Sequence, residues 1–316
     1  MIRLGVAVRV LGRGGLRARD GRRAVHAPHL SVSLLLVREV LLYLADQRIS
    51  CYRLADDLAP YLTHPGLPQF GGQIAECAEL LGEIGALARA HGQRLTMHLG
   101  MHVRLSAPDV ALADRSAAEI VAQARLFDAL GAGPEGVLVI HIGGAYGDSG
   151  AALQRFATRF ERLPLSVRRR VVVEPDEDDF ALADLLRLHQ QIGVPVVLDT
   201  LHQQINNPHG LALAEALGLA LATWPRGVRP KIHYSSQRTE AHLLAAGHGL
   251  ERQVLAPRPG QHADYINPFE FAAFVAAARG LAPFDVMLEA KAADLAVLRL
   301  RLDLRRYAPA LAPLVH

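Results

Sequence analysis

The chain has 316 residues, a formal net charge of +3 and hydrophobic residues at 51% of its positions. The hydrophobic residues are numerous enough for one large core. Barrels of roughly 250 residues fold as single domains, so we expect one domain. The two cysteines, Cys51 and Cys77, show no pairing pattern, which indicates a reducing compartment, and we expect a cytoplasmic protein. Arg3 and Arg9 interrupt the apolar N-terminal run and no small-residue cleavage site follows, so we expect neither a signal peptide nor a membrane span.

Positive charge is carried almost entirely by arginine, because Lys231 and Lys291 are the only lysines. Arginine recognises phosphate through two parallel hydrogen bonds, which favours a phosphate-bearing partner. A genome rich in G and C, which favours arginine codons, explains the same bias. The composition leaves both explanations open.

Strand-like apolar runs alternate with amphipathic helical stretches along the whole chain. The expected strands are 2–8, 49–54, 94–98, 137–141, 171–174, 194–199, 231–233 and 285–289. The expected helices are 32–47, 72–91, 111–130, 151–163, 180–192, 210–224, 268–279 and a closing helix at about 292–307. This alternation predicts an α/β fold, a (β/α)₈ TIM barrel that forms one domain over residues 1–316.

Two connections, 9–29 after the first strand and 235–267 after the seventh, are unusually long, and both belong to the catalytic rim of such a barrel. The first contains four glycines and six arginines: Arg9, Arg13, Arg17, Arg19, Arg22 and Arg23. It is either a clamp for a nucleic-acid backbone or a solvated loop, and the sequence favours neither.

Six of the expected strands end at a potential metal ligand. These residues are His98, His141, Glu174, Asp199, His233 and Glu289, and the rim loops add His64, His202 and His262. Active sites of these barrels lie at the carboxyl ends of the strands. Nine imidazoles and carboxylates are too many for one ion, so we predict a cluster of roughly two or three divalent ions.

The cost of burying such groups supports the metal interpretation. Each unpaired buried ionisable group costs several kcal/mol, and nine would exceed the ~5–15 kcal/mol stability of a domain. Any one histidine can still be a hydrogen-bonded core residue.

Lys231 lies two residues before His233 and points the same way, so it is neutral, modified or a ligand of substrate phosphate. The glycine-rich turn around Tyr146 allows close approach to a phosphate. Such a cluster would hydrolyse a phosphodiester with activated water.

Several motifs, in this order along the chain, resemble the UV damage endonuclease family, relatives of endonuclease IV. They are Tyr52-Arg53, Thr63-His64-Pro65, Met97-His98, the stretch from His141 to Gly147, Glu174 with Asp176-Glu177, Asp199 to His202, Pro230 to His233 with Ser235-Ser236, His262 to Ile266, and Met287 to Lys291. The resemblance implies a TIM barrel, a cluster of up to three ions, and incision of damaged double-stranded DNA 5′ to a lesion. Manganese is the expected metal, with zinc or magnesium as alternatives.

The resemblance also assigns roles to individual residues. All nine candidate ligands match ligand positions, and Glu174, His233 and Lys231 are the expected catalytic residues. The expected DNA contacts are Met101, His102, Tyr146, Arg9, Arg13 and Arg53. It implies no protein partner, and access of a duplex to the rim favours a monomer.

The chain departs from the family pattern where the lesion is probed. Members usually carry Gln followed by Tyr or Phe, and Met101 and His102 stand there instead. Val6 and the arginine-rich loop replace an aromatic residue and an Asn, Pro175 replaces Asn, and Gln203 replaces a second His. We therefore expect an intact hydrolytic site with a shifted lesion preference. Two alternatives remain: a divalent-metal sugar isomerase or epimerase on the same barrel, and a damaged-DNA binder that does not cleave.

Overall fold

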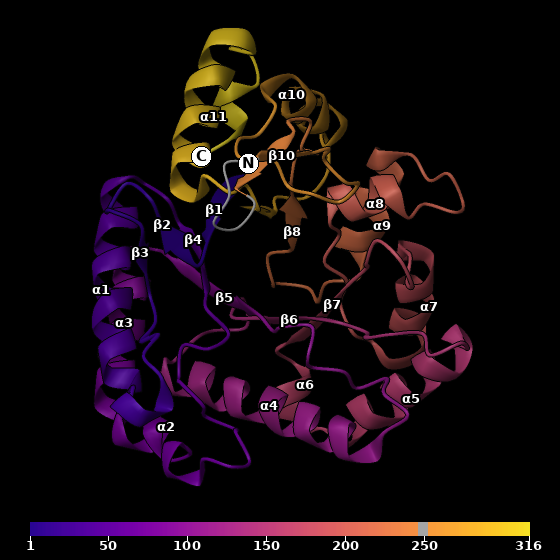
Figure 1. The fold of residues 1–316 in the computed structure, drawn as a ribbon. Helices are drawn as coiled ribbons and strands as arrows, with labels where there is room; N and C mark the ends of the chain where they lie inside the picture. Colours follow the sequence, from indigo (N-terminus) through magenta and orange to yellow (C-terminus); the bar gives the residue numbers. More distant parts are fainter. Residues whose placement is uncertain (246–251) are drawn as a thin grey trace.

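Seven parallel strands form one curled sheet in the computed structural model, which describes residues 1–245 and 252–316 (Figure 1). Their order across the sheet is β7-β6-β5-β4-β1-β11-β8. The strands are β1 (Arg3–Ala7), β4 (Cys51–Leu54), β5 (Arg94–His98), β6 (Leu138–His141), β7 (Val171–Glu174), β8 (Lys231–Tyr234) and β11 (Asp285–Leu288). The first and last residues of each strand differ by at most two positions from those of an expected strand.

The remaining expected strand, residues 194–199, joins the sheet between β7 and β8 through isolated bridges, so the prediction of a regular strand there was wrong. Val196 bridges Val173, and Asp199 bridges His233. The physical reason lies in Pro195, which has no N–H to donate to a ladder, although its carbonyl accepts from the Val173 N–H at 2.9 Å. These contacts close the ring of eight parallel segments, which confirms the predicted TIM barrel.

Helices surround this ring (Figure 1). The longer ones are α1 (Leu30–Asp46), α3 (Ala78–Ala90), α4 (Val110–Ala129), α5 (Ser149–Arg162), α7 (Leu182–Ile192), α9 (Leu213–Ala222), α10 (Pro268–Ala277) and the predicted closing helix α11 (Ala293–Tyr307). Shorter ones are α2 (Gln73–Glu76), α6 (Leu165–Arg168), α8 (Thr200–Ile205), η1 (Ala24–His26), η2 (Pro68–Phe70) and η3 (Ala312–Leu314). Within the described ranges, no helix is long and apolar enough to cross a bilayer.

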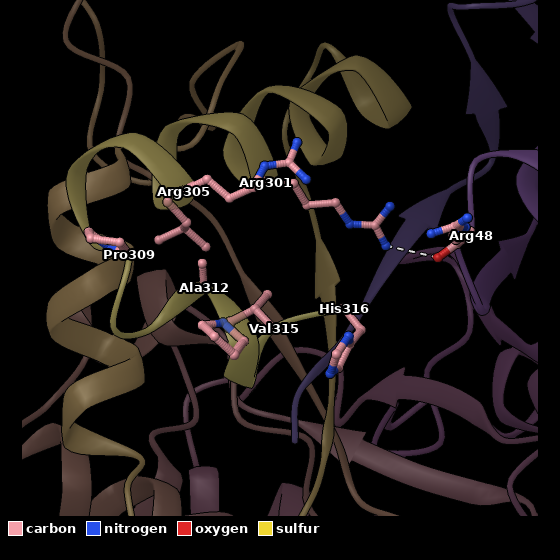
Figure 2. Close-up of a pocket in the computed structure, with 9 residues that line it drawn as sticks. Arg48, Arg301, Arg305, Pro309, Ala312, Val315 and His316 are labelled. Atoms are coloured by element: carbon pink, nitrogen blue, oxygen red, sulfur yellow. Dashed lines mark hydrogen bonds between the residues drawn. The ribbon is translucent and has the colours of Figure 1, made fainter.

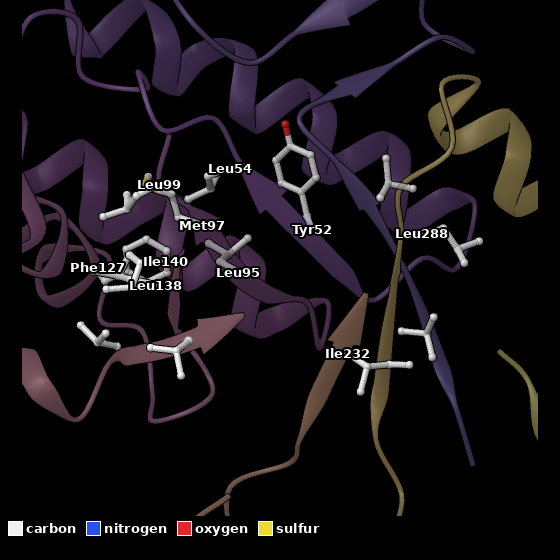
Figure 3. Close-up of a cluster of buried hydrophobic side chains, with 14 of the residues drawn as sticks. Tyr52, Leu54, Leu95, Met97, Leu99, Phe127, Leu138, Ile140, Ile232 and Leu288 are labelled. Carbon is white, nitrogen blue, oxygen red and sulfur yellow. The ribbon is translucent and has the colours of Figure 1, made fainter. Parts of the chain in front are cut away.

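The core lies mainly between the strands and the helices. Apolar side chains such as Met97, Ile140 and Leu288 leave the sheet on its outer face and are fully buried (Figure 3). Alternate residues of the same strands point to the opposite face, into the barrel. Because this inner set includes Arg94 and Lys231, the barrel interior is unusually polar, and its upper layer forms the site described below.

Both long rim connections contain a hairpin, which was not predicted. The first pairs β2 (Arg9–Val10) with β3 (Leu16–Arg17), and the second pairs β9 (His242–Ala245) with β10 (Arg252–Leu255). Gly14 and Gly15 turn the first hairpin at φ +66° and +77°, a region that glycine enters without strain. Residues 246–251 of the second connection lie outside the described part.

Candidate metal centre

Glu174, at the end of β7, is the centre of a buried group of imidazoles. Its Oε2 lies 2.6 Å from His98 Nε2, and its Oε1 lies 2.8 Å from His233 Nδ1. His141 Nε2 and His202 Nδ1 approach the same carboxylate at 3.7 Å each. These histidines come from β5, β8, β6 and α8, so four elements of the rim converge on one carboxylate.

Two further carboxylates extend the group. Asp199 begins α8, and its Oδ1 accepts hydrogen bonds from the backbone N–H groups of Leu201 (2.7 Å) and His202 (2.9 Å). This N-cap fixes the aspartate and sets the direction of the short helix that carries His202. Glu289 follows β11 and lies 3.4 Å from His233 Nδ1 and 3.9 Å from His262 Nε2.

Potential ligand atoms fall into three overlapping groups, in each of which they lie within 4.8 Å of one another. The groups are His98 with Glu174 and His233, Glu174 with Asp199 and His202, and Asp199 with His233 and Glu289. Since neighbouring groups share a carboxylate or an imidazole, the arrangement suits several adjacent ions more than one isolated ion.

Buried donor atoms without a partner support this interpretation. Among the described residues, His141 Nδ1, Asp199 Oδ2 and His233 Nε2 are shielded from solvent and have no hydrogen-bond partner. Leaving a buried polar atom unpaired costs about 1–3 kcal/mol. Imidazole nitrogen and carboxylate oxygen are ligands for zinc and manganese, so the donor set fits the metal that the sequence predicts.

Burial of these ionisable side chains shifts their pKa values, as expected for a group of charges that are held together away from solvent. Burial raises the pKa of Asp199 to about 6, and burial lowers the pKa of His233 to about 4. Burial would also raise the pKa of Glu174, but His233 and His98 hold it well below its usual range. For His202, burial lowers the pKa, and Asp199 and Glu174 outweigh it and raise the pKa to about 9. Perturbed pKa values of this kind are typical of functional sites.

The structure brings eight of the nine predicted ligands together: the six of the three groups, with His141 beside Glu174 and His262 beside Glu289. His64 is elsewhere. Its side chain is exposed, its Nδ1 accepts from the Gly66 N–H at 3.2 Å, and its ring meets Tyr61 edge-on. It lines a cavity of about 350 Å³ together with His102. Its role as a ligand stays a prediction.

Lys231 lies inside the barrel, one inward-facing position before His233. The side chain is fully buried, and its Nζ donates to Thr96 Oγ1 at 3.3 Å. Burial lowers its pKa to about 7. The predicted catalytic lysine is therefore below the ligand layer, and its pKa lies well below that of a free lysine.

The predicted DNA contacts occupy three places on the rim. Met101 and His102 are exposed on the turn after β5, and Tyr146 is 43% exposed on the turn after β6. Arg9 donates to the Lys291 carbonyl at 3.1 Å, and Arg13 pairs with Glu39 at 3.7 Å on the surface. Arg53 contacts Glu289 directly and so borders the metal centre.

Sequence reasoning missed the contact between Glu177 and the site. Glu177 Oε2 lies 3.3 Å from His202 Nε2, on the side of that ring away from Glu174. Its position three residues after Glu174, in a motif that the resemblance already included, was the available signal. The partner of Lys231, Thr96, lies two residues before His98 on β5, and same-face spacing was the corresponding signal.

Comparison with known proteins agrees with this geometry. The UV DNA damage endonuclease of Bacillus pumilus (strain SAFR-032) is 28% identical over 269 residues, which cover 85% of this chain and 79% of that protein. The crystal structure of SacUVDE matches with a TM-score of 0.81 and 27% identity, covering 97% of this chain and 99% of that one. The 3-keto-D-glucoside 4-epimerase of E. coli matches with a TM-score of 0.56 at 13% identity, which shows a shared fold alone.

A family model described as UV-endonuclease UvdE matches residues 19–312, so the match includes every predicted ligand. The protein therefore belongs to the UV-endonuclease UvdE family.

Proposed function

We propose that the protein is a metal-dependent DNA repair endonuclease that incises the backbone of damaged duplex DNA 5′ to a lesion. The observation that carries this proposal is the buried group around Glu174 at the catalytic rim, in which several donor atoms have no hydrogen-bond partner among the described residues. Membership of the family and the names of its relatives support a nuclease that acts on DNA.

The residues that would hold the ions are those of the rim cluster: His98, His141, Glu174, Asp199, His202, His233, His262 and Glu289. We expect roughly two or three ions, manganese first, with zinc or magnesium as alternatives. When bound, such ions lower the pKa of a coordinated water towards about 7 and stabilise the attacking and leaving oxygens of a phosphodiester.

The protein's own contribution is to fix these donors and exclude water. Glu174 holds His98 and His233 in orientation through its two oxygens, and the N-cap of α8 holds Asp199. The Pro175 carbonyl lies 3.0 Å from His202 Nδ1, which orients that ring. Lys231 supports the layer from below and supplies a proton donor or acceptor on the inner side of His233.

The lesion reader is a tight turn that presents Met101 to solvent. The side chain of Met101 is 57% exposed, while its carbonyl accepts from Arg104 Nε at 2.8 Å. The side chains of His102 and Asp56 lie close to Gly100, at 2.8 Å and 2.9 Å from where a Cβ would stand. An exposed apolar side chain suits insertion between bases. Met101 cannot donate amide hydrogen bonds, so we infer a preference shifted from photoproducts towards abasic or other distorted sites.

A groove lined with arginine on the same rim would hold the DNA backbone. Arg9 and Arg17 are directly opposite each other in the β2–β3 hairpin, an arrangement that is destabilising for like charges. With Arg19 and Arg53 they line a groove of about 320 Å³ at the ends of β1 and β4, where Asp57 pairs with Arg19 and Asp56 also belongs to the lining. Phosphates placed there would relieve the repulsion, which favours the clamp over the solvated loop.

The test is a nicking assay with Mn²⁺ on four labelled duplexes that are identical except at one site: intact, cyclobutane dimer, 6-4 photoproduct and abasic. Incision 5′ to the abasic site, with little at either photoproduct, is the expected result. Equal or better incision at the dimer would contradict the shifted preference. Binding without nicking of any duplex would support the non-cleaving alternative and overturn the proposal. Chelation of the metal is the matched control and should abolish incision.

A further inference from the structure

A basic cavity lies at the opposite end of the barrel from the metal centre. It is enclosed by the last turns of α11, the residues that follow α1 and the C-terminal segment (Figure 2), and its volume is about 470 Å³. α11 starts at the catalytic rim, so its last turns lie at the amino-terminal ends of the strands. The cavity is therefore separate from the proposed nuclease site.

Four basic residues line this cavity: Arg48, Arg301, Arg305 and His316. Its lining includes no Asp or Glu. Within residues 1–245 and 252–316, none of the three arginines forms an ion pair with a carboxylate side chain. The positive charge here is therefore not neutralised by the described side chains.

Local structure accounts for each arginine only in part. Arg301 donates to the Gln47 and Arg48 carbonyls, both at 2.9 Å, and so satisfies carbonyls at the end of α1. Arg305 lies in the last turn of α11, where the helix dipole favours a cation. Neither role explains why Arg305 lies near Arg301, where burial and the charge of Arg305 lower the pKa of Arg301.

Arg301 is held in place inside the cavity, while Arg48 and Arg305 are exposed beside it. The two carbonyl hydrogen bonds hold the Arg301 fork, which leaves its other N–H groups for a ligand. The backbone of Arg48 has φ +55°, a left-handed conformation that a residue other than glycine rarely adopts. One side of the cavity is apolar, and its accessible residues include Pro309 and Pro313.

We propose that this cavity binds a small phosphorylated anion, with its phosphate on Arg48, Arg301 and Arg305 and a ring against the apolar wall at Pro309 and Pro313. Arginine is the side chain best suited to hold phosphate through paired hydrogen bonds. The volume lies within the roughly 300–1,000 Å³ typical of small-molecule sites. Mixed charged and apolar lining selects an amphipathic ligand of nucleotide type over a bare ion.

Calorimetric titration of the metal-loaded protein tests this assignment with three probes: AMP, adenosine and inorganic phosphate. We expect AMP to bind more tightly than either of its parts. The double variant Arg48→Asn and Arg305→Gln should weaken AMP binding by roughly tenfold or more, because two charged hydrogen-bonding groups are lost. Asn tolerates the left-handed backbone at position 48, and Arg301 is kept because it is part of the fold.

Arg125→Ala, which removes an exposed arginine on α4, is the matched control and should leave AMP binding unchanged. The double variant should also incise DNA as fast as the unmodified protein. AMP that binds at the metal centre would be unaffected by the double variant, so unchanged affinity would overturn the proposal. Absence of AMP binding would overturn it as well, and equal affinity for AMP and phosphate would overturn the ring-binding wall.

Discussion

The two ends of the barrel interior each hold a buried carboxylate surrounded by nitrogen donors, but the donors differ in kind. At the amino-terminal end, both oxygens of Asp285 accept from guanidinium groups. Arg3 and Arg229 donate to Oδ1 at 2.6 Å each, while Arg3 and Arg94 donate to Oδ2 at 2.6 and 2.9 Å. At the carboxyl-terminal end, the corresponding donors to Glu174 are imidazoles.

This difference separates a structural charge cluster from a functional one. A guanidinium stays protonated in proteins, so it can neutralise a carboxylate but cannot ligate a metal. An imidazole titrates near neutral pH and offers a lone pair, and at the Glu174 end some of these atoms are unpaired. Similar burial therefore supports stability at one end and suits the proposed metal binding at the other, the end where the fold class places active sites.

The largest effect should come from Glu174→Gln, which breaks the comparison at the functional end. The amide cannot accept from His98 and His233 through two charged oxygens, and one shared ligand is lost. We expect incision to fall by at least roughly a thousandfold, more than the 10–100-fold typical of an outer partner of a metal site. A labelled abasic duplex with Mn²⁺ measures it.

Metal-dependent stability is the control for that variant. A ligand at a hundredfold excess over its Kd stabilises the folded protein by about 2.7 kcal/mol, so Mn²⁺ should raise the melting temperature of the unmodified protein. Glu174→Gln should lose most of that increase. An unchanged response to Mn²⁺ would place the ions elsewhere and contradict the proposed centre.

Asp285→Asn tests the structural end and should act on stability alone. Removing one partner from a buried charge cluster costs about 3–5 kcal/mol, because Arg3, Arg94 and Arg229 are left without their shared carboxylate. Chemical denaturation should show this loss with and without Mn²⁺. Incision, measured where both proteins are folded, should be unchanged; a loss as large as that of Glu174→Gln would remove the distinction between the two ends.

Lys231→Met tests whether the buried amine serves the reaction at the Glu174 end or the stability of the barrel. Methionine keeps the length of the side chain and removes its polar group, so the free energy of unfolding should stay the same or rise. If Lys231 serves the reaction, incision should fall by about 10²–10⁴-fold, the range for a proton-transfer group. Loss of stability with full activity would make Lys231 a structural residue.

The sequence predicted the barrel because buried parallel strands leave long apolar runs with polar ends, and these runs are local signals. Six of the eight predicted ligands that the structure brings together followed from the same rule, since strand ends of a closed barrel meet at one rim, and His202 and His262 were added from the loops of that rim. His64 does not join them, because it lies on an irregular loop whose path depends on contacts such as that with Tyr61. The hairpin around Gly14 and Gly15 had a sequence signal, which was a pair of glycines between short apolar runs. It was missed because the connection was interpreted only from its many arginines.

The smallest effect concerns acid. Burial would raise the pKa of Asp285, but its hydrogen bond from Arg3 and the charge of Arg94 hold it below its usual value. A carboxylate with a lowered folded-state pKa adds stability that is complete above its unfolded pKa of about 3.9 and is lost as the pH falls through the folded value. The difference in unfolding free energy between the unmodified protein and Asp285→Asn should therefore be constant from about pH 5 upwards and shrink below about pH 4. Denaturation measured in metal-free buffer tests this without a contribution from metal binding at the proposed centre around Glu174. A difference that grows in acid would mean that Asp285 is protonated in the folded barrel and that the arginines, not their carboxylate, dominate that end.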